Sequence, residues 1–204
     1  IGDMEITANQ RSINQVEIRP DIPGRSVHFR VSLAEADQQQ SWQLLVNISF
    51  QGKTIATRKV IAGNAITDFQ VPISQPKLWD EFTPHLYTAT VQLLKKNKFE
   101  DNYKASFGMR NVSNSNSLLQ INGRRIFLRG TLECNIFPLT GHPPMKKEGW
   151  IKLMTTAKSY GLNHLRFHSW CPPEAAFAVA DSLGLYLQVE LPLWATIGRK
   201  RDST

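Results

Sequence analysis

The spacing of the apolar residues changes once along this chain, near residue 117. Before that point, short runs alternate between apolar and polar residues and are separated by turn residues, which is typical of an antiparallel β-sandwich. After it, apolar residues recur at helical spacing between short β-rich runs. This change predicts two domains of different class, an all-β domain followed by an α/β domain.

Seven β-rich runs fill the first part of the chain, and no helical periodicity interrupts them. The clearest run, Ser26 to Ala34, alternates strictly, so one face of that strand is expected to be buried and the other solvated. Seven strands in about 100 residues favour an immunoglobulin-like β-sandwich. The predicted strands are 15–19, 26–34, 42–51, 53–61, 65–72, 86–95 and 102–109.

The second part begins with a predicted hairpin. The runs 118–121 and 125–129 flank Asn122-Gly123, which suits a type I′ turn because both central residues of that turn need a positive φ. Helices are predicted from about Trp150 to Gly161 and from Pro173 to Gly184, and each leads directly into a strand.

Strands at 126–131, 164–168 and 185–191 complete a β-α-β-α-β order, which requires parallel pairing with right-handed crossovers. Three such strands fit the start of a (β/α)8 barrel or half of a doubly wound sheet. The spacing of the apolar residues leaves both architectures open.

Polar and aromatic residues follow each predicted parallel strand. Ligands bind at the carboxyl ends of such strands in both α/β architectures, so these positions form the candidate site. Carboxylate, Arg, His and Asn side chains can hydrogen-bond sugar hydroxyls, and Trp can lie against the apolar face of a sugar ring, which predicts carbohydrate binding. The candidate substrate-binding residues are Glu133, Asn135, Arg166, His168, Trp170, Glu190 and Trp194.

The same residues have a purely structural interpretation. Trp170 and Trp194 would then cover the barrel core, and Arg166 would form an ion pair with Glu133 or Glu190. Glu133 and Glu190 are also one pair of carboxyls that could flank a glycosidic bond. Because an intervening strand separates them, interstrand spacing predicts a distance of roughly 8–10 Å, which is long for a retaining mechanism.

The sequence lacks the motifs of a dinucleotide site, a cysteine nucleophile and a zinc site. A dinucleotide site needs a G-x-G-x-x-G spacing behind the first parallel strand, where only Gly130 and Gly141 occur. A cysteine nucleophile needs a base and a third orienting group; His168 is close to Cys171 in sequence, but no third group is identified. Cys134 and Cys171 lack the paired spacing of a zinc site and are interpreted as free thiols, although a single bridge between them stays open.

The net charge of +7 would suit an anionic partner, but the basic residues are dispersed and no nucleic-acid-binding module occurs, so no nucleic-acid partner is expected. The chain has no run of about 18 apolar residues and no signal peptide at its start, so no membrane contact is expected. The compartment stays open, and a periplasmic or secreted parent protein is compatible with the sequence.

Five stretches resemble motifs of glycoside hydrolase family 2, the family of β-galactosidases and β-glucuronidases. Residues 78–88 resemble its LW-x-x-x-x-P-x-LY stretch, and residues 107–110 its FGFR strand. In chain order, residues 119–130, 163–166 and 181–187 resemble LLNGKPVFLRG, NAVR and DELGLYV. The motifs follow the order of the family over essentially the whole chain.

The resemblance implies a domain organisation and an activity. Residues 1–14 would be the tail strand of a preceding jelly-roll sugar-binding domain, 15–112 the immunoglobulin-like sandwich, and 113–204 the N-terminal part of a TIM-barrel catalytic domain. The parent protein would hydrolyse non-reducing-end glycosidic bonds with retention. Family members carry their two catalytic glutamates after the fourth and seventh barrel strands, beyond Thr204, so this fragment is expected to be inactive.

The chain also departs from the family pattern. RGVNRHE is replaced by the residues from Arg129 to Asn135, which leaves the sugar open. The magnesium ligands of β-galactosidases fall on Trp194 and Thr196, whose side chains cannot replace them, so neither a metal nor another cofactor is expected. Glu190 matches the glutamate of the family's DE pair at the end of strand three, which implies a positioning or structural role.

Two alternatives to the fragment of an enzyme remain. A non-catalytic carbohydrate-binding module would use Arg166, His168, Trp170 and Trp194 without chemistry. Three barrel strands also leave a sheet edge exposed, and an exposed edge favours pairing with another chain, which predicts self-association.

Overall fold

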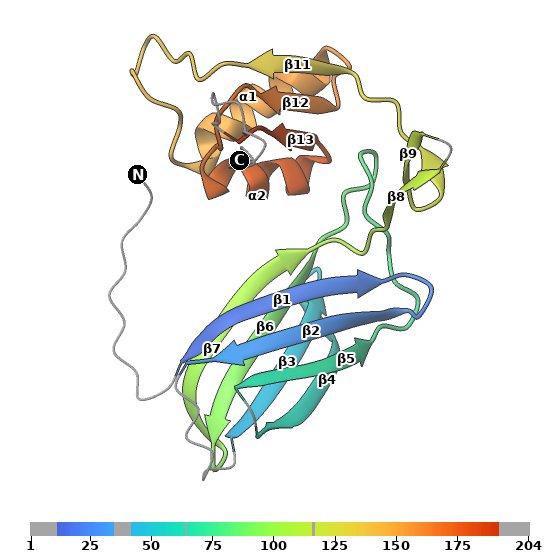
Figure 1. Cartoon of the computed structure of the whole chain (residues 1–204), viewed down its shortest axis with the longest axis vertical. Coiled ribbons are helices and arrows are strands. Elements are labelled where there is room, and N and C mark those ends of the chain that lie inside the picture. Colours follow the sequence, from blue (N-terminus) through green and yellow to red (C-terminus); the bar gives the residue numbers. More distant parts are fainter. Residues whose placement is uncertain (1–11, 35–41, 64, 116, 192–204) are drawn as a thin grey trace, which may run out of the picture. The chain divides into compact units, whose positions relative to one another are not determined.

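The computed structural model describes residues 12–34, 42–63, 65–115 and 117–191. The chain forms two compact units, which comprise residues 1–127 and 128–204 and are drawn in Figure 1. In the described residues, the first unit contains strands and the second alternates strands with helices, as the sequence predicted. None of the helices in the described ranges is long and apolar enough to span a membrane.

Two antiparallel sheets face each other in the first unit, as Figure 1 shows. One sheet has the order β1-β2-β5 and consists of β1 (Ile13–Asp21), β2 (Ser26–Leu33) and β5 (Ile66–Pro72). The other has the order β4-β3-β6-β7 and consists of β4 (Lys53–Ala62), β3 (Trp42–Phe50), β6 (Tyr87–Lys95) and β7 (Lys98–Phe107). The seven predicted strands all occur within a few residues of their expected bounds.

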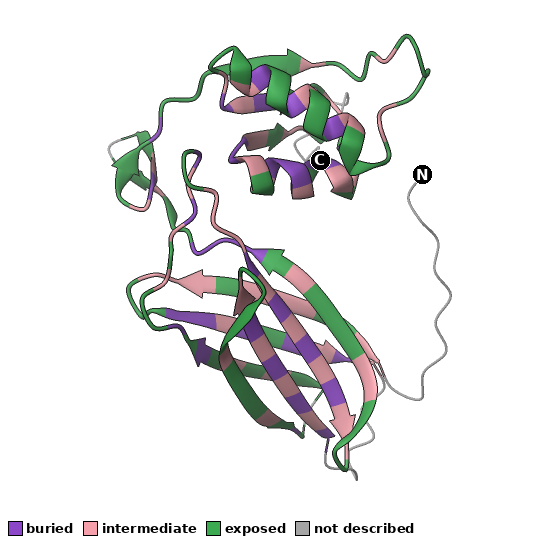
Figure 2. Cartoon of the chain, turned by 180° about the vertical axis from the view of Figure 1, so that it is seen from behind, coloured by how far each residue is buried: buried purple, intermediate pink, exposed green. Residues whose placement is uncertain are grey.

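The core of this sandwich comes from the alternation seen in the sequence. Val27, Phe29 and Val31 of β2 are buried, and every second residue of β3 and β6 is buried as well. Figure 2 shows this banding along the strands. Each fully buried Val, Leu, Ile or Phe side chain stabilises the fold by about 1.5–3 kcal/mol, so the alternation decides which face of each strand turns inward.

Three of the motif stretches meet at one place in the first unit. Trp79 is buried, its N–H donates to the Met109 carbonyl at 2.9 Å, and its own carbonyl accepts a hydrogen bond from Asn122 Nδ2 at 3.0 Å. Gly108 lies so close to the indole that a Cβ there would be 2.7 Å from the Trp79 Cβ. We call this cluster the packed joint; it consists of Trp79, Gly108, Met109 and Asn122.

A small sheet of β8 (Val112–Ser115), β9 (Leu118–Ile121) and β10 (Arg124–Arg125) adjoins this joint. Asn122 and Gly123 have φ values of 52° and 79°, as the predicted hairpin turn requires. Arg124 lies 2.6 Å from the carboxylate of the buried Glu81. These contacts fix the hairpin to the sandwich, and the first compact unit extends to Phe127.

The second unit contains a parallel sheet of order β11-β12-β13 with a helix after each of its first two strands. Its elements are β11 (Gly130–Glu133), α1 (Lys147–Ser159), β12 (His164–Phe167), α2 (Glu174–Leu183) and β13 (Tyr186–Val189). The parallel β-α-β-α-β prediction is confirmed. Gly161 and Gly184, which were expected to end the helices, have φ values of 78° and 73°, which favour glycine at a helix C-terminus.

The bounds of some elements differ from the prediction. The strand expected at 126–131 begins only at Gly130, because Ile126 is buried in the first unit and its N–H donates to the Leu119 carbonyl at 2.9 Å. At the other end, β1 begins at Ile13, which pairs with Leu33, so this strand starts two residues before the predicted strand 15–19. Residues 1–11 of the tail strand expected at 1–14 lie outside the described residues.

Candidate functional site

The candidate residues lie at the carboxyl ends of the three parallel strands. Glu133 pairs with Phe167 in the sheet register, and Phe167 pairs with Val189. The residues that follow these three positions are therefore neighbours across the sheet. Hydrogen bonds extend the pairing one step further: the His168 N–H donates to the Glu133 carbonyl at 2.9 Å, and the Glu190 N–H donates to the Phe167 carbonyl at 3.4 Å. The sheet therefore brings Glu133, His168 and Glu190 to one edge.

Arg166 points to the side of the sheet away from the helices. Its strand neighbours Leu165 and Phe167 are buried against the helices, and alternation turns Arg166 and His164 to the opposite face. There the Arg166 guanidinium forms an ion pair with Glu190 through both Nε and Nη2. Of the two partners considered from the sequence, Glu190 is the one that the structure pairs with Arg166.

Glu190 is held by more than this ion pair. Its second carboxylate oxygen accepts the Ser169 backbone N–H at 3.0 Å. The hydrogen bond from Arg166 lowers the pKa of Glu190 below its ordinary value, and the Ser169 N–H and the nearby His168 act in the same direction. Glu190 is thus an ionised carboxylate that fixes Arg166 and the backbone after β12.

Glu133 turns back on its own chain. Both of its carboxylate oxygens lie 3.0 Å from the Asn135 backbone N–H, and its carbonyl also accepts Trp170 Nε1 at 3.4 Å. Asn135 and Ser169 have left-handed φ values of 58° and 59°, a conformation that Asn tolerates better than most residues. These two turns set the direction in which the chain leaves β11 and β12.

Trp170 is half-buried against an aromatic cluster. Its ring centroid lies 5.3 Å from that of Phe167 and 6.5 Å from that of Trp150. This packing agrees with the structural interpretation of Trp170, and its partial exposure leaves part of the side chain accessible. His168 is exposed, and its Nδ1 lies 3.8 Å from Cys134 Sγ.

The remaining candidates have simpler outcomes. Cys134 and Cys171 are free and exposed, as interpreted from the sequence. Trp194, and Thr196 at the family's metal position, lie outside the described residues. Within the described ranges, no three His, Cys, Asp or Glu side chains are grouped so that they could hold a metal ion.

Two features of this edge were not predicted from the sequence. The Ser169 contribution is a backbone N–H, which leaves no signal in residue type. His164 lies over Gly130, where a Cβ would be 2.3 Å from its Nδ1, and burial lowers the pKa of His164. Gly130 is therefore needed because a larger residue would collide with the His164 side chain on the next strand. Before the structure, the only signal for this glycine was its place in the family motif.

Replacing Glu190 by Gln is expected to remove an acid-sensitive part of the stability of the second unit. Because the folded pKa of Glu190 is depressed, its contribution is present above its ordinary pKa near 4.5 and is lost as the pH falls through the lower folded pKa. Urea unfolding should therefore show a deficit of Glu190→Gln at pH 7 that shrinks below about pH 4. The exposed Glu174→Gln serves as the control, and a deficit of equal size at both pH values would contradict the assignment.

Comparison with known proteins identifies relatives along most of the chain. Residues 11–110 match the model of the family described as glycosyl hydrolases family 2. A putative beta-glucuronidase from Formosa agariphila is 28% identical over 151 residues, which cover 71% of this chain and 14% of the relative. A beta-galactosidase from Thermoanaerobacter pseudethanolicus is 24% identical over 176 residues, which cover 76% of this chain and 24% of the relative.

Solved structures share the fold. A glycosyl hydrolase family 2 member from Bacteroides cellulosilyticus has a TM-score of 0.79 at 22% identity, covering 87% of this chain and 24% of that one. A Bifidobacterium dentium beta-glucuronidase complexed with coumarin-3-O-glucuronide has a TM-score of 0.79 at 20% identity, covering 90% and 31%. The chain thus spans less than a third of the length of these relatives. Together, these findings show that the chain is similar to members of glycoside hydrolase family 2.

Proposed function

We propose that this chain is part of a retaining glycoside hydrolase that removes sugars from the non-reducing ends of carbohydrates. The observation that carries the proposal is the polar edge formed by Glu133, Arg166, His168 and Glu190 at the carboxyl ends of three parallel strands. This is where α/β enzymes bind their substrates. The family 2 relatives are β-galactosidases and β-glucuronidases, which act on glycosides.

The proposal includes an architecture for the two units. The strand orders β1-β2-β5 and β4-β3-β6-β7 support an immunoglobulin-like sandwich. The sequential parallel order β11-β12-β13, with helices packed on one face, supports the first three strands of a (β/α)8 barrel. A doubly wound sheet of order 3-2-1-4-5-6 also has its first three strands in sequential order, so the choice of a barrel rests on the resemblance to the family 2 motifs.

Each candidate residue has a role in sugar binding under this proposal. Glu190 fixes the Arg166 guanidinium, which carries five N–H donors and can offer the remaining ones to sugar hydroxyls. His168 is exposed beside this pair and can donate or accept according to its protonation. The half-buried Trp170 would limit one side of the sugar, and Asn135, two residues after the end of β11, is proposed as a further polar contact. Trp194 is proposed as a second aromatic contact.

Neither strand-end glutamate suits the part of a catalytic acid. A general acid needs a raised pKa so that it is protonated near neutral pH, whereas the ion pair with Arg166 lowers the pKa of Glu190. Both oxygens of Glu133 lie 3.0 Å from the Asn135 N–H, so its carboxylate is turned back onto its own chain. These contacts support positioning roles for both residues, with the catalytic glutamates after the fourth and seventh strands of the whole barrel.

Hydrolysis of aryl glycosides tests the proposed function. The full-length protein encoded by the gene and the 204-residue chain would be assayed side by side with aryl β-galactoside, aryl β-glucuronide and other aryl glycosides. We expect turnover by the full-length protein alone. Turnover by the 204-residue chain would place the catalytic pair among its own carboxylates, and no turnover by either would leave a non-catalytic binding module, which the relatives do not favour.

In the full-length protein, Arg166→Ala is expected to reduce kcat/KM by about 10- to 100-fold, because hydrogen bonds to charged groups contribute roughly 1.5–3 kcal/mol. Arg125→Ala, an exposed arginine of the hairpin strand β10, is the matched control. A change of less than threefold for Arg166→Ala would remove Arg166 from the proposed sugar site.

A further inference from the structure

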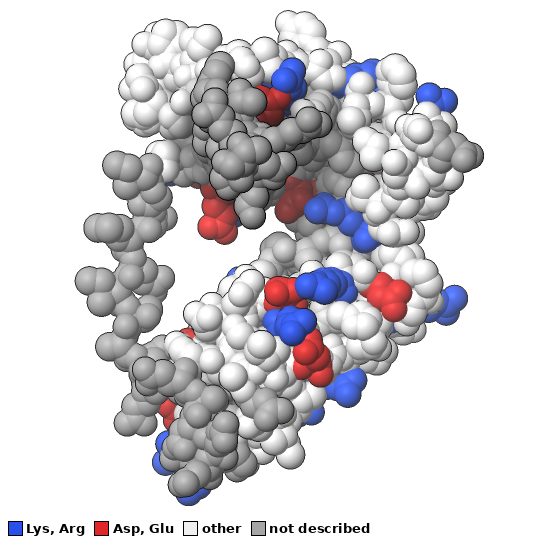
Figure 3. All heavy atoms as spheres, in the orientation of Figure 1, with Lys and Arg blue, Asp and Glu red and all other residues white. Residues whose placement is uncertain are grey.

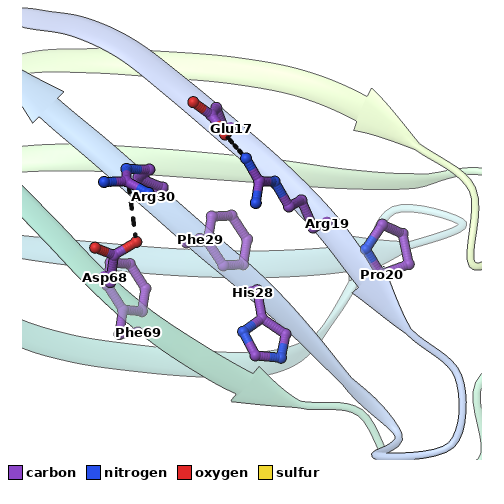
Figure 4. A pocket seen from close by; sticks show the side chains of 8 residues that line it. All are labelled: Glu17, Arg19, Pro20, His28, Phe29, Arg30, Asp68 and Phe69. Carbon is purple, nitrogen blue, oxygen red and sulfur yellow. Dashed lines mark hydrogen bonds and ion pairs between the residues drawn. The ribbon is translucent and has the colours of Figure 1, made fainter.

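The outer face of the sheet β1-β2-β5 carries charged side chains of both signs that belong to no feature described above. Because core residues alternate with outward ones, Glu17, Arg19, His28, Arg30 and Asp68 all turn away from the core. Figure 3 shows acidic and basic side chains next to one another on this face, and Figure 4 shows these five residues from close by.

Two hollows lie in line on this face. The larger has a volume of about 300 Å³, and the smaller has a volume of about 80 Å³. The larger is lined by Glu17, Arg19, Pro20, His28, Phe29, Arg30, Asp68 and Phe69, and the smaller by Gln15, Glu17, Arg30, Ser32 and Ile66. Glu17 and Arg30 line both. Glu17 and Arg30 are paired across β1 and β2, and one hollow lies on each side of this pair. The two hollows therefore form one groove, which we call the outer groove.

The side chains of the outer groove are held in place by their neighbours. Arg19 forms an ion pair with Glu17, and Arg30 Nε lies 3.9 Å from Asp68 Oδ1; Figure 4 draws both contacts. His28 lies 2.9 Å from the Gln70 side-chain nitrogen. A guanidinium has five N–H donors and a carboxylate about four acceptor positions, so each group keeps free hydrogen-bonding capacity after these contacts.

The charges of the outer groove favour a neutral ligand over an anion. Arg19 and Arg30 are balanced by Glu17 and Asp68, and Asp21 lies 3.7 Å from His28. The charges of these two arginines and two acidic residues therefore cancel. The groove offers donors and acceptors side by side, which matches sugar hydroxyls because each hydroxyl both donates and accepts.

The smaller hollow adds an unmade hydrogen bond and an apolar wall. The Ser32 hydroxyl oxygen is shielded from water and has no hydrogen-bond partner within the described residues. A buried hydroxyl without a partner is unfavourable, and Ser32 lines the smaller hollow, where a ligand hydroxyl would supply the missing partner. Ile66 is 46% exposed and presents aliphatic surface that suits the C–H face of a sugar ring.

We propose that the outer groove binds a neutral oligosaccharide segment. Two adjoining hollows that share Glu17 and Arg30 suit consecutive sugar units of one chain. The sugar unit in the larger hollow would contact Arg19, Arg30 and Asp68. The choice of a saccharide as ligand rests on the proposed function. The groove lies in the first unit, whereas the strand-end site lies in the second, so its occupation is separable from hydrolysis.

The test is the binding of tetrasaccharides to the ¹⁵N-labelled 204-residue chain, followed by NMR. The neutral probes are galactotetraose, cellotetraose and xylotetraose, and tetragalacturonate is the acidic probe. We expect at least one neutral probe to shift amide signals of β1, β2 and β5, with dissociation constants in the range of about 0.1–10 mM, because the contacts are largely solvent-exposed hydrogen bonds.

Arg30→Ala is expected to weaken that binding by about tenfold or more, since Arg30 lines both hollows. Lys104→Ala removes the same charge from the exposed surface of β7, in the other sheet, and should leave binding unchanged. No shift with any neutral probe, stronger binding of tetragalacturonate, or equal binding by the Arg30→Ala chain would each overturn the proposal. None of these results depends on turnover by the full-length protein, so the two proposals fail separately.

Discussion

Trp150→Ala is expected to lower the free energy of unfolding of the second unit by about 3–5 kcal/mol. The Trp150 side chain is fully buried, and its ring centroid lies 6.0 Å from that of Phe167 and 6.2 Å from that of Phe137. Its Nε1 also donates to the Pro144 carbonyl at 2.7 Å. The alanine variant leaves a cavity and an unpaired carbonyl, and a loss of this size is a large part of the 5–15 kcal/mol that stabilises a typical domain.

Hydrogen–deuterium exchange measures this loss of stability in the second unit itself. Amide protons of α1 and β12 should exchange at least 100-fold faster in the Trp150→Ala chain, because exchange from a unit that opens reports its free energy of opening. Tyr160→Ala removes an aromatic side chain that is 81% exposed near the end of the same helix, and should change exchange little. Acceleration below about fivefold in α1 and β12 would show that Trp150 does not hold this unit together.

Most of the sandwich could be predicted because its strands are long and half-buried. The alternation in β2 and β3 gives each residue one of two faces, and burial follows that assignment in the structure. β8 was missed because its residues, Val112–Ser115, are short, polar and nearly all exposed, so they show no alternation. The run from Ile126 to Leu128 was expected in a strand, but the structure has no strand there: Ile126 is buried in the first unit, whereas Phe127 and Leu128 are exposed. An apolar run alone does not show which of its residues are buried.

The candidate site could be predicted less completely. Strand order brought Glu133, His168 and Glu190 to one edge, since the carboxyl ends of parallel strands coincide. The sequence could not decide whether Arg166 pairs with Glu133 or Glu190, because that choice depends on the direction of side chains in the turns after β11 and β12. The outer groove was also missed, since outward polar residues of a strand are ordinarily solvated.

The motifs that carry the family resemblance have different physical roles. The stretch with Arg166 contributes a side chain to the strand-end site. The stretches with Trp79, Gly108 and Asn122 build the packed joint of the first unit instead. The motifs that resemble family 2 therefore include residues that hold the scaffold, and chemistry has to be assigned from the strand ends.

Trp79→Ala tests this division and is expected to cost the first unit about 3–5 kcal/mol. Its buried indole packs beside Gly108 and beneath the Arg110 guanidinium, whose carbon lies 4.7 Å from the ring. Alanine keeps the backbone hydrogen bonds of residue 79, so the loss reports the side chain alone. Urea unfolding of the 204-residue chain should show it, with Phe99→Ala, 59% exposed in β7, as the aromatic control. A loss below about 1 kcal/mol would mean that the joint is held by its backbone hydrogen bonds, and the motif's tryptophan would then need a role outside packing.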